Sequence, residues 1–173
     1  MQRFPYNTVA AKMPLRPIPW MICTGYPDHA EELNVEISGY AVMGFSAGGH
    51  LAASFGTENL GWAYYGLPVP ATMILCYPVI TMGAKTHDGS RQFLLDDLAD
   101  DPTAQKKYSI EQQVSDRYPA TYVWQFDADD IVPIDNSRML MDALRKNNIP
   151  NKYETFPGTL HGAGLGTGTP AEG

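Results

Sequence analysis

Short apolar runs alternate with amphipathic segments along most of this 173-residue chain. Apolar runs of about four to eight residues between turn signals are typical of strands buried on both faces of a parallel sheet. Apolar positions that recur every three or four residues indicate helices instead. These patterns predict strands at residues 37–45, 71–77, 120–126 and 151–156. They predict helices at residues 27–34, 48–55, 91–98, 109–114 and 135–147.

Turn and cap residues bound several of these elements. Gly56 is expected to end the helix that starts at residue 48, and Pro78 to end the second strand. Asp135 and Asn136 are the two candidates for the N-cap of the last helix, because short polar side chains accept hydrogen bonds from the first turn.

The order of the elements alternates strand and helix, which predicts an α/β fold with a mostly parallel sheet flanked by helices. Residues 1–173 are expected to form a single domain, since this length is enough for one real core. Residues 79–117 form a long polar segment after a core strand, and we expect this segment to lie over the strand ends as a lid or pocket wall.

Charge and composition exclude several classes of function. The net charge is −7 and the chain has no basic run, so nucleic acid is not an expected partner. No apolar stretch reaches the roughly 18 residues that cross a bilayer, and prolines interrupt residues 13–21, where a signal peptide would need its apolar core. A cytoplasmic protein without membrane partners is therefore expected. Of the two cysteines, Cys76 lies in an apolar run and is predicted to be a small buried residue, and no metal site is indicated.

Residues 44–48 read G-F-S-A-G and lie between a predicted strand and a predicted helix. This is the G-x-S-x-G pattern in the context of a nucleophile elbow, a sharp turn in which the serine backbone is strained. We expect both Gly44 and Gly48 to avoid Cβ clashes with neighbouring backbone, and the Ser46 hydroxyl to stand clear near the positive end of the next helix. Such a pentad occurs by chance in roughly 5–10% of chains of this length. Its value as evidence for a nucleophile therefore depends on whether a base and an acid follow it in the right order.

A serine hydroxyl needs a base, and histidine suits this role because its usual pKa lies near neutral pH. Of the four histidines, His161 follows the last predicted strand in a glycine-rich loop and is the predicted base. His50 lies one turn after Ser46 and is predicted to pack or hydrogen bond away from the hydroxyl. His29 is expected on an exposed helix and His87 in a solvated polar loop.

An acid is needed to hold the imidazole in the correct tautomer. Asp127, Asp129 and Asp130 all follow the predicted strand at 120–126, and at most one of them can have this role. A solvated acidic turn is the alternative interpretation of all three. The order of serine, acid and histidine along the chain is that of the α/β-hydrolases, and differs from the orders in chymotrypsin and subtilisin.

Several stretches together resemble the α/β-hydrolase superfamily, and within it the carboxylesterase group that includes acetyl-xylan-esterase-like and feruloyl-esterase-like enzymes. These stretches are Gly44–Ala53, Cys76–Ile80, Asp129–Pro133 with Asn136-Ser137, and Phe156–Gly158 leading to His161-Gly162. The resemblance covers about residues 31–165. It is specific for the superfamily and less so for the substrate.

The resemblance implies ester hydrolysis through an acyl-serine intermediate, without a cofactor. It implies a triad of Ser46, Asp129 and His161, because Asp129 is the first acid of the matching D-D-I-V-P stretch. Asp130 stays open as the alternative acid. The resemblance further implies that the backbone N–H of Ala47 donates to the oxyanion.

Members of this family usually have more chain before the elbow, with the first strands of the sheet and a His-Gly-Gly loop that completes the oxyanion hole. No His-Gly-Gly precedes Ser46 here. We therefore expect a sheet without its usual first strands and with an exposed edge, which a homodimer would cover. Two explanations stay open: residues 1–27 replace this region in another arrangement, or activity is impaired, because loss of one oxyanion donor costs roughly 10²–10³ in kcat.

The predicted function is that of a serine carboxylesterase acting on small acetyl-type esters. One alternative is a degenerate or truncated hydrolase fold that binds without turnover. The other is a peptidase of the prolyl-oligopeptidase type, which shares the fold and the order of the triad.

Overall fold

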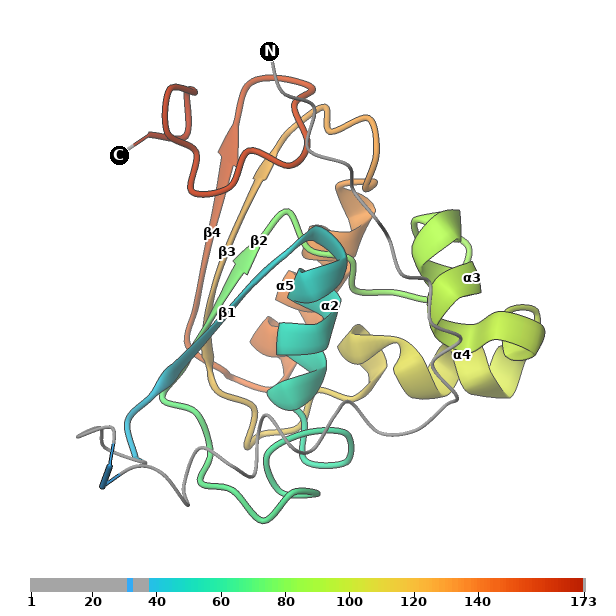
Figure 1. Cartoon of the computed structure of the whole chain (residues 1–173), viewed down its shortest axis with the longest axis vertical. Coiled ribbons are helices and arrows are strands. Elements are labelled where there is room, and N and C mark those ends of the chain that lie inside the picture. Colours follow the sequence, from blue (N-terminus) through green and yellow to red (C-terminus); the bar gives the residue numbers. More distant parts are fainter. Residues whose placement is uncertain (1–30, 33–37, 173) are drawn as a thin grey trace.

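The computed structural model describes residues 31–32 and 38–172, and within these ranges the chain forms a four-stranded sheet in the order β1-β2-β3-β4 (Figure 1). Neighbouring strands are parallel throughout. The strands are β1 (Ala41–Phe45), β2 (Thr72–Cys76), β3 (Ala120–Phe126) and β4 (Asn151–Phe156). The α-helices are α2 (Ser46–Phe55), α3 (Asp88–Leu95), α4 (Pro102–Tyr108) and α5 (Asp135–Lys146), with 3₁₀ turns η1 (Asp96–Leu98) and η2 (Ile110–Gln112).

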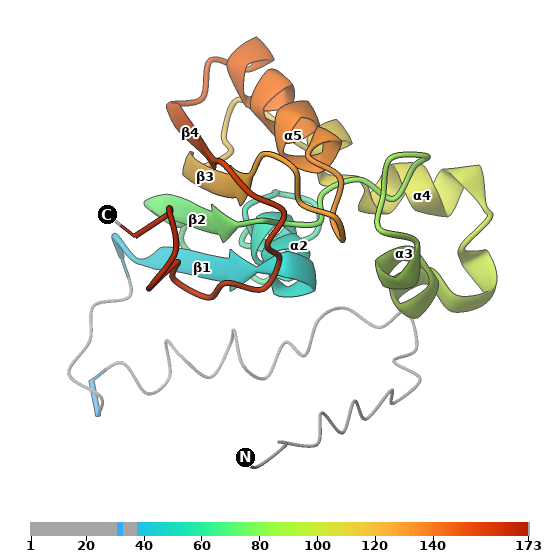
Figure 2. The same ribbon diagram turned by 90° about the horizontal axis from the view of Figure 1, so that it is seen from above.

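Helices α2 and α5 cover one face of the sheet, as both ribbon views show (Figures 1 and 2). Alternate strand residues point to this face, because successive side chains of a strand point to opposite sides. Met73 and Val123 are fully buried there with Leu140 and Leu144 of α5 in the main apolar core. The predicted α/β architecture with a parallel sheet is thus confirmed.

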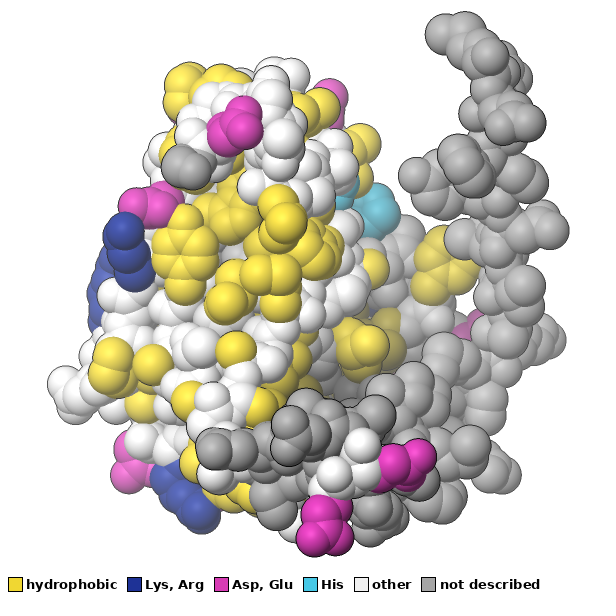
Figure 3. All heavy atoms as spheres, turned by 60° about the vertical axis from the view of Figure 1, so that its left-hand side comes forward, with side chains coloured by type: hydrophobic (Ala, Val, Ile, Leu, Met, Phe, Trp, Pro, Cys, Tyr) yellow, Lys and Arg dark blue, Asp and Glu magenta, His cyan; other side chains and the backbone are white. Residues whose placement is uncertain are grey.

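The opposite face of the sheet carries a second, aromatic cluster. Trp124 lies at its centre, with ring centroids 5.8 Å from Phe126 and 6.0 Å from Phe156. The chain after β4 crosses part of this face in Figure 2, where it packs Ala163 and Ala171 against the cluster. Figure 3 shows hydrophobic side chains gathered on this side of the molecule.

Within the described residues β1 pairs only with β2, so it forms one edge of the sheet. Met43 on this strand is 45% exposed. The predicted homodimer across this edge stays a prediction. In the part of the chain that the structure describes, no helix is both long and apolar enough to cross a membrane.

Several predicted boundaries need correction. Helix α4 (Pro102–Tyr108) was not predicted, although Asp101 accepts a hydrogen bond from the backbone N–H of Thr103 and Pro102 occupies the first turn, where proline is well tolerated. The predicted helix at 109–114 is only the short turn η2. The predicted helix at 27–34 lies outside the described residues except for a turn at 31–32.

The cap of α5 also differs from the prediction. Ile134 is the N-cap and no side chain caps the helix. Asn136 instead lies inside the first turn, fully buried, and its Oδ1 accepts from the backbone N–H groups of Ile80 and Thr81 at 2.9 and 3.1 Å. The same side chain donates to the backbone oxygen of Lys85 at 2.9 Å. Asn136 therefore fixes the start of the 79–117 segment to α5.

The 79–117 segment holds α3 and α4, and its residues Val79, Met82 and Leu95 are buried in a small second core together with Val132. Both ribbon views place α3 and α4 beyond α2, on the side away from the sheet (Figures 1 and 2). His87 is half-buried rather than solvated as predicted, and its Nδ1 accepts from the backbone N–H of Ser90 at 3.2 Å, which caps α3. The role of the segment as a lid or pocket wall stays a prediction.

Candidate active site

The turn between β1 and α2 has the geometry of a nucleophile elbow. Strand β1 ends at Phe45 and helix α2 starts at Ser46, whose φ is +54°. A non-glycine residue in this region stores about 1–3 kcal/mol of strain, and it persists only where the surroundings determine it. The backbone oxygen of Ser46 accepts from the N–H of Val79 at 3.0 Å, which links the elbow to the chain after β2.

The two glycines of the pentad are not equivalent. A Cβ on Gly44 would lie 2.3 Å from the backbone oxygen of Gly48 and 2.6 Å from Cβ of Ala52, so the predicted clash is confirmed there. A Cβ on Gly48 would meet nothing within 4 Å, so the clash predicted at that position is wrong. The second close approach is at Gly49, where a Cβ would lie 2.7 Å from Cβ of Pro78.

This difference predicts opposite effects of two alanine substitutions. Gly44→Ala is expected to lower the free energy of unfolding by about 3 kcal/mol or more, because the atoms in its way are backbone and a helix Cβ. Gly48→Ala is expected to raise it by up to about 1 kcal/mol, because alanine favours a helix over glycine where space is open. Urea unfolding of both variants measures these changes in the free energy of unfolding. Similar losses of stability in the two variants would contradict the account.

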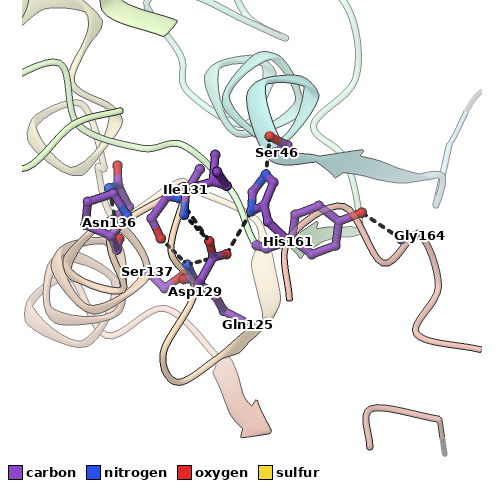
Figure 4. A network of polar contacts seen from close by, with 11 residues as sticks. Ser46, Gln125, Asp129, Ile131, Asn136, Ser137, His161 and Gly164 are labelled. Atoms are coloured by element: carbon purple, nitrogen blue, oxygen red, sulfur yellow. Dashed lines mark hydrogen bonds and ion pairs between the residues drawn. The ribbon is translucent and has the colours of Figure 1, made fainter. Parts of the chain in front are cut away.

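The hydrogen bonds of the site run from Ser46 through His161 to Asp129 (Figure 4). Ser46 Oγ lies 2.8 Å from Nε2 of His161, and His161 Nδ1 lies 2.8 Å from Oδ2 of Asp129. The three side chains meet because β1, β3 and β4 are parallel and end at the same edge of the sheet. The structure thus brings together the three residues that the sequence analysis predicted for the site.

Asp129 is the acid that reaches His161. Its Oδ1 accepts from the backbone N–H groups of Ile131 and Val132, both at 3.0 Å, and its side chain has no exposed surface. Asp130 is exposed, and Asp127 accepts from the backbone N–H of Gly158 at 3.0 Å. Of the two acids that the sequence left open, Asp129 is the one whose carboxylate lies within hydrogen-bonding distance of His161, and its role as the acid of the triad stays a prediction.

Tyr77 supports the loop that holds His161, and the sequence interpretation missed this role. Its backbone has a φ of +39°, its ring centroid lies 4.9 Å from that of His161, and its hydroxyl accepts from the backbone N–H of Gly164 at 2.9 Å. Burial raises the pKa of Tyr77, so the phenol stays neutral. The available signal was the tyrosine-proline pair at the end of a buried strand, which was interpreted only as the end of that strand and as part of the matching stretch Cys76–Ile80.

The backbone N–H of Ala47 lies in the first turn of α2, beside Ser46. N–H groups in a first turn have no acceptor within their helix, and the helix dipole favours negative charge there. This position can bind an oxyanion. The predicted role of Ala47 as an oxyanion donor is consistent with this placement and stays a prediction.

His50 forms a hydrogen bond away from this chemistry, as predicted. It is 7% exposed, and its Nε2 lies 2.8 Å from the backbone oxygen of Tyr108 at the end of α4. Burial lowers the pKa of His50 from its usual value of 6.5, although the hydrogen bond to Tyr108 acts in the opposite direction. His50 is therefore a neutral buried link between α2 and the 79–117 segment. The predicted burial of Cys76 is also confirmed, at 1% exposure.

Acidification is expected to destabilise the fold through His50. The unfolded state takes up a proton below about pH 6.5, whereas folded His50 stays neutral to a lower pH, so the free energy of unfolding falls as the pH decreases. The loss from this one group approaches about 1.4 kcal/mol per pH unit between the two pKa values. His50→Gln keeps an N–H donor but cannot titrate, so its urea unfolding should depend less on pH. An equal slope in both proteins would contradict this role.

Comparison with known proteins identifies a matching family and two related proteins. A model of the prolyl oligopeptidase family matches residues 28–171. The chain is 34% identical over 142 residues to endo-1,4-beta-xylanase B of Butyrivibrio fibrisolvens, covering 78% of this chain and 22% of that protein. It is 31% identical over 144 residues to the acetylxylan esterase of Xylanibacter ruminicola, covering 81% of this chain and 29% of that protein. The chain thus spans about a quarter of the length of these relatives.

A solved structure extends the comparison to three dimensions. The acetyl ester-xyloside bifunctional hydrolase from Caldicellulosiruptor lactoaceticus matches with a TM-score of 0.75 and 32% identity. The match covers 84% of this chain and 56% of that chain. Together with the family match, it confirms the predicted α/β-hydrolase fold.

Proposed function

Because this chain belongs to the prolyl oligopeptidase family of α/β-hydrolases, we propose that it is a serine carboxylesterase that cleaves small acetyl-type esters. The observation that carries this proposal is the hydrogen-bonded arrangement of Ser46, His161 and Asp129 at the carboxyl edge of the sheet. The related acetylxylan esterase and the acetyl ester-xyloside hydrolase support an ester as the substrate.

In the proposed reaction, Nε2 of His161 takes the hydroxyl proton of Ser46 while Oγ attacks the ester carbonyl carbon. Asp129 accepts the Nδ1–H of His161, which holds the tautomer and stabilises the imidazolium that forms. The backbone N–H of Ala47 stabilises the oxyanion. When the intermediate collapses, His161 returns the proton to the leaving alcohol, and an acetyl-serine remains.

Water completes the cycle. His161 takes a proton from the water, whose oxygen attacks the acetyl carbonyl, and then returns a proton to Oγ of Ser46 as acetate leaves. The strained backbone of Ser46 holds Oγ within reach of His161 throughout both halves of the reaction. No residue beyond those named has to donate or accept a proton.

A comparison of three substrates tests the proposal. We expect hydrolysis of p-nitrophenyl acetate and release of acetate from acetylated xylo-oligosaccharides, both absent in Ser46→Ala. An N-blocked Gly-Pro p-nitroanilide tests the peptidase alternative that the family name also allows. Cleavage of the anilide alone would overturn the esterase proposal, and a folded chain that turns over none of the three would support the alternative without turnover.

A further inference from the structure

A fully buried glutamine contacts the acid of the candidate triad. Gln125 is the last but one residue of β3, and none of its surface is exposed. Its Nε2 lies 3.2 Å from Oδ2 of Asp129, the oxygen that also accepts from His161. The same Nε2 donates to the backbone oxygen of Val132 at 2.7 Å.

The orientation of this amide follows from its partners at both ends. The hydroxyl of Ser137 on α5 donates to Oε1 of Gln125 at 2.6 Å, and Ser137 is itself fully buried. The carboxylate of Asp129 and the backbone oxygen of Val132 can only accept, so Nε2 must be the atom that faces them, and both of its hydrogens have acceptors. Figure 4 shows Gln125 and Ser137 on the side of Asp129 that faces away from Ser46.

Asp129 therefore accepts four hydrogen bonds: two on Oδ1 from Ile131 and Val132, and two on Oδ2 from His161 and Gln125. The two donors to Oδ1 are backbone N–H groups, which do not depend on the side chains at those positions. The second donor to Oδ2 is the side chain of Gln125. Buried donors of this kind orient a charged group and compensate for its removal from water.

We propose that Gln125, held by Ser137, is a positioning residue that directs Oδ2 of Asp129 at His161. The proposal rests on the proposed serine esterase function, since it concerns the acid of that triad. Gln125 has no exposed surface and cannot touch a substrate, so its contribution must act through Asp129. Its loss should therefore lower kcat and leave KM unchanged.

Gln125→Met removes the donor and keeps the length of the side chain. We expect kcat for p-nitrophenyl acetate to fall by about 10- to 100-fold at every pH, with KM unchanged. Gln105→Met is the matched control, because Gln105 of α4 donates its amide to a backbone oxygen, that of Ala99 at 2.7 Å, and not to a triad residue. Unchanged kcat in folded Gln125→Met would overturn the proposal.

Gln125→Glu separates positioning from mere packing. One glutamate oxygen would still accept from Ser137, but the other would face two acceptors, the Val132 oxygen and Oδ2 of Asp129. This oxygen must carry a proton, and burial next to Asp129 raises the pKa of the new carboxyl. While protonated it can donate to Asp129, and once ionised it repels Asp129.

The variant should therefore lose activity as the pH rises above the pKa of the new carboxyl, whereas the parent chain keeps its activity over that range. A pH profile parallel to that of the parent would contradict the positioning role. If neither variant of Gln125 folds, Ser137→Ala decides: a fall in kcat at constant KM supports the proposal, and an unchanged kcat overturns it.

A spectroscopic measurement keeps this test separate from the proposed function. We expect the Nδ1 proton between His161 and Asp129 to give a downfield proton NMR signal, which is assigned by its loss in His161→Gln. We expect this signal to shift or broaden in Gln125→Met and to persist unchanged in Gln105→Met. If the parent chain had no esterase activity, the proposed function would fail, whereas an unchanged signal in Gln125→Met would count against the positioning role alone.

Discussion

Replacing Ser46 by alanine is expected to lower kcat for p-nitrophenyl acetate by about 10⁴-fold or more, to the background that binding and the oxyanion donor alone provide. In the proposed reaction the attacking group is the hydroxyl of Ser46, which lies 2.8 Å from Nε2 of His161 on the strained turn. Steady-state kinetics measure this loss, and a thermal melt on the same samples checks the fold.

The matched control lies on the same helix. Ser54→Ala removes a buried hydroxyl that donates to the backbone oxygen of Leu51 at 2.8 Å, away from His161. This variant should keep kcat within about twofold of the parent, since a local hydrogen bond within a helix contributes little to the site. Retention of more than a tenth of the activity in Ser46→Ala would rule out Ser46 as the nucleophile.

Asp129→Asn is expected to lower kcat by about 10⁴-fold, because an amide in place of the carboxylate favours the wrong tautomer of His161. The same change at Asp130 should alter kcat by less than about twofold, since Asp130 is exposed while Asp129 lies 2.8 Å from Nδ1 of His161. Kinetics of the two variants, measured side by side, test the choice between adjacent acids. A larger loss in Asp130→Asn would reverse the assignment.

The sequence predicted a strand best where a continuous apolar run is bounded by turn residues. The bounds of β3 and β4 match the predicted ranges, and β1 and β2 are shorter than predicted by a few residues at their ends. The helices of the long polar segment after β2 were harder to predict, because α4 depends on a local cap and a proline rather than on a wide apolar face. Residues of this segment pack into a small second core with Val132, and no periodicity along the chain reveals this contact.

The sequence predicted which residue types form the candidate site, but not the side chains that hold them in place. Serine, acid and histidine each follow a strand, and parallel strands end at one edge, so their meeting follows from the order of elements. Gln125 and Tyr77 could not be found this way, because their roles depend on which side chain reaches which across the fold. The difference between Gly48 and Gly49 likewise depends on where Pro78 passes the helix.

The measurement that tests the central claim most directly is the capture of a covalent intermediate. The purified chain is incubated with a fluorophosphonate ester, digested, and mapped by mass spectrometry. The account predicts one modification at Ser46, absent in Ser46→Ala and slowed in His161→Gln, with p-nitrophenyl acetate protecting the parent chain. A folded chain that stays unmodified, or that is modified at another serine with equal speed in Ser46→Ala, would contradict the account.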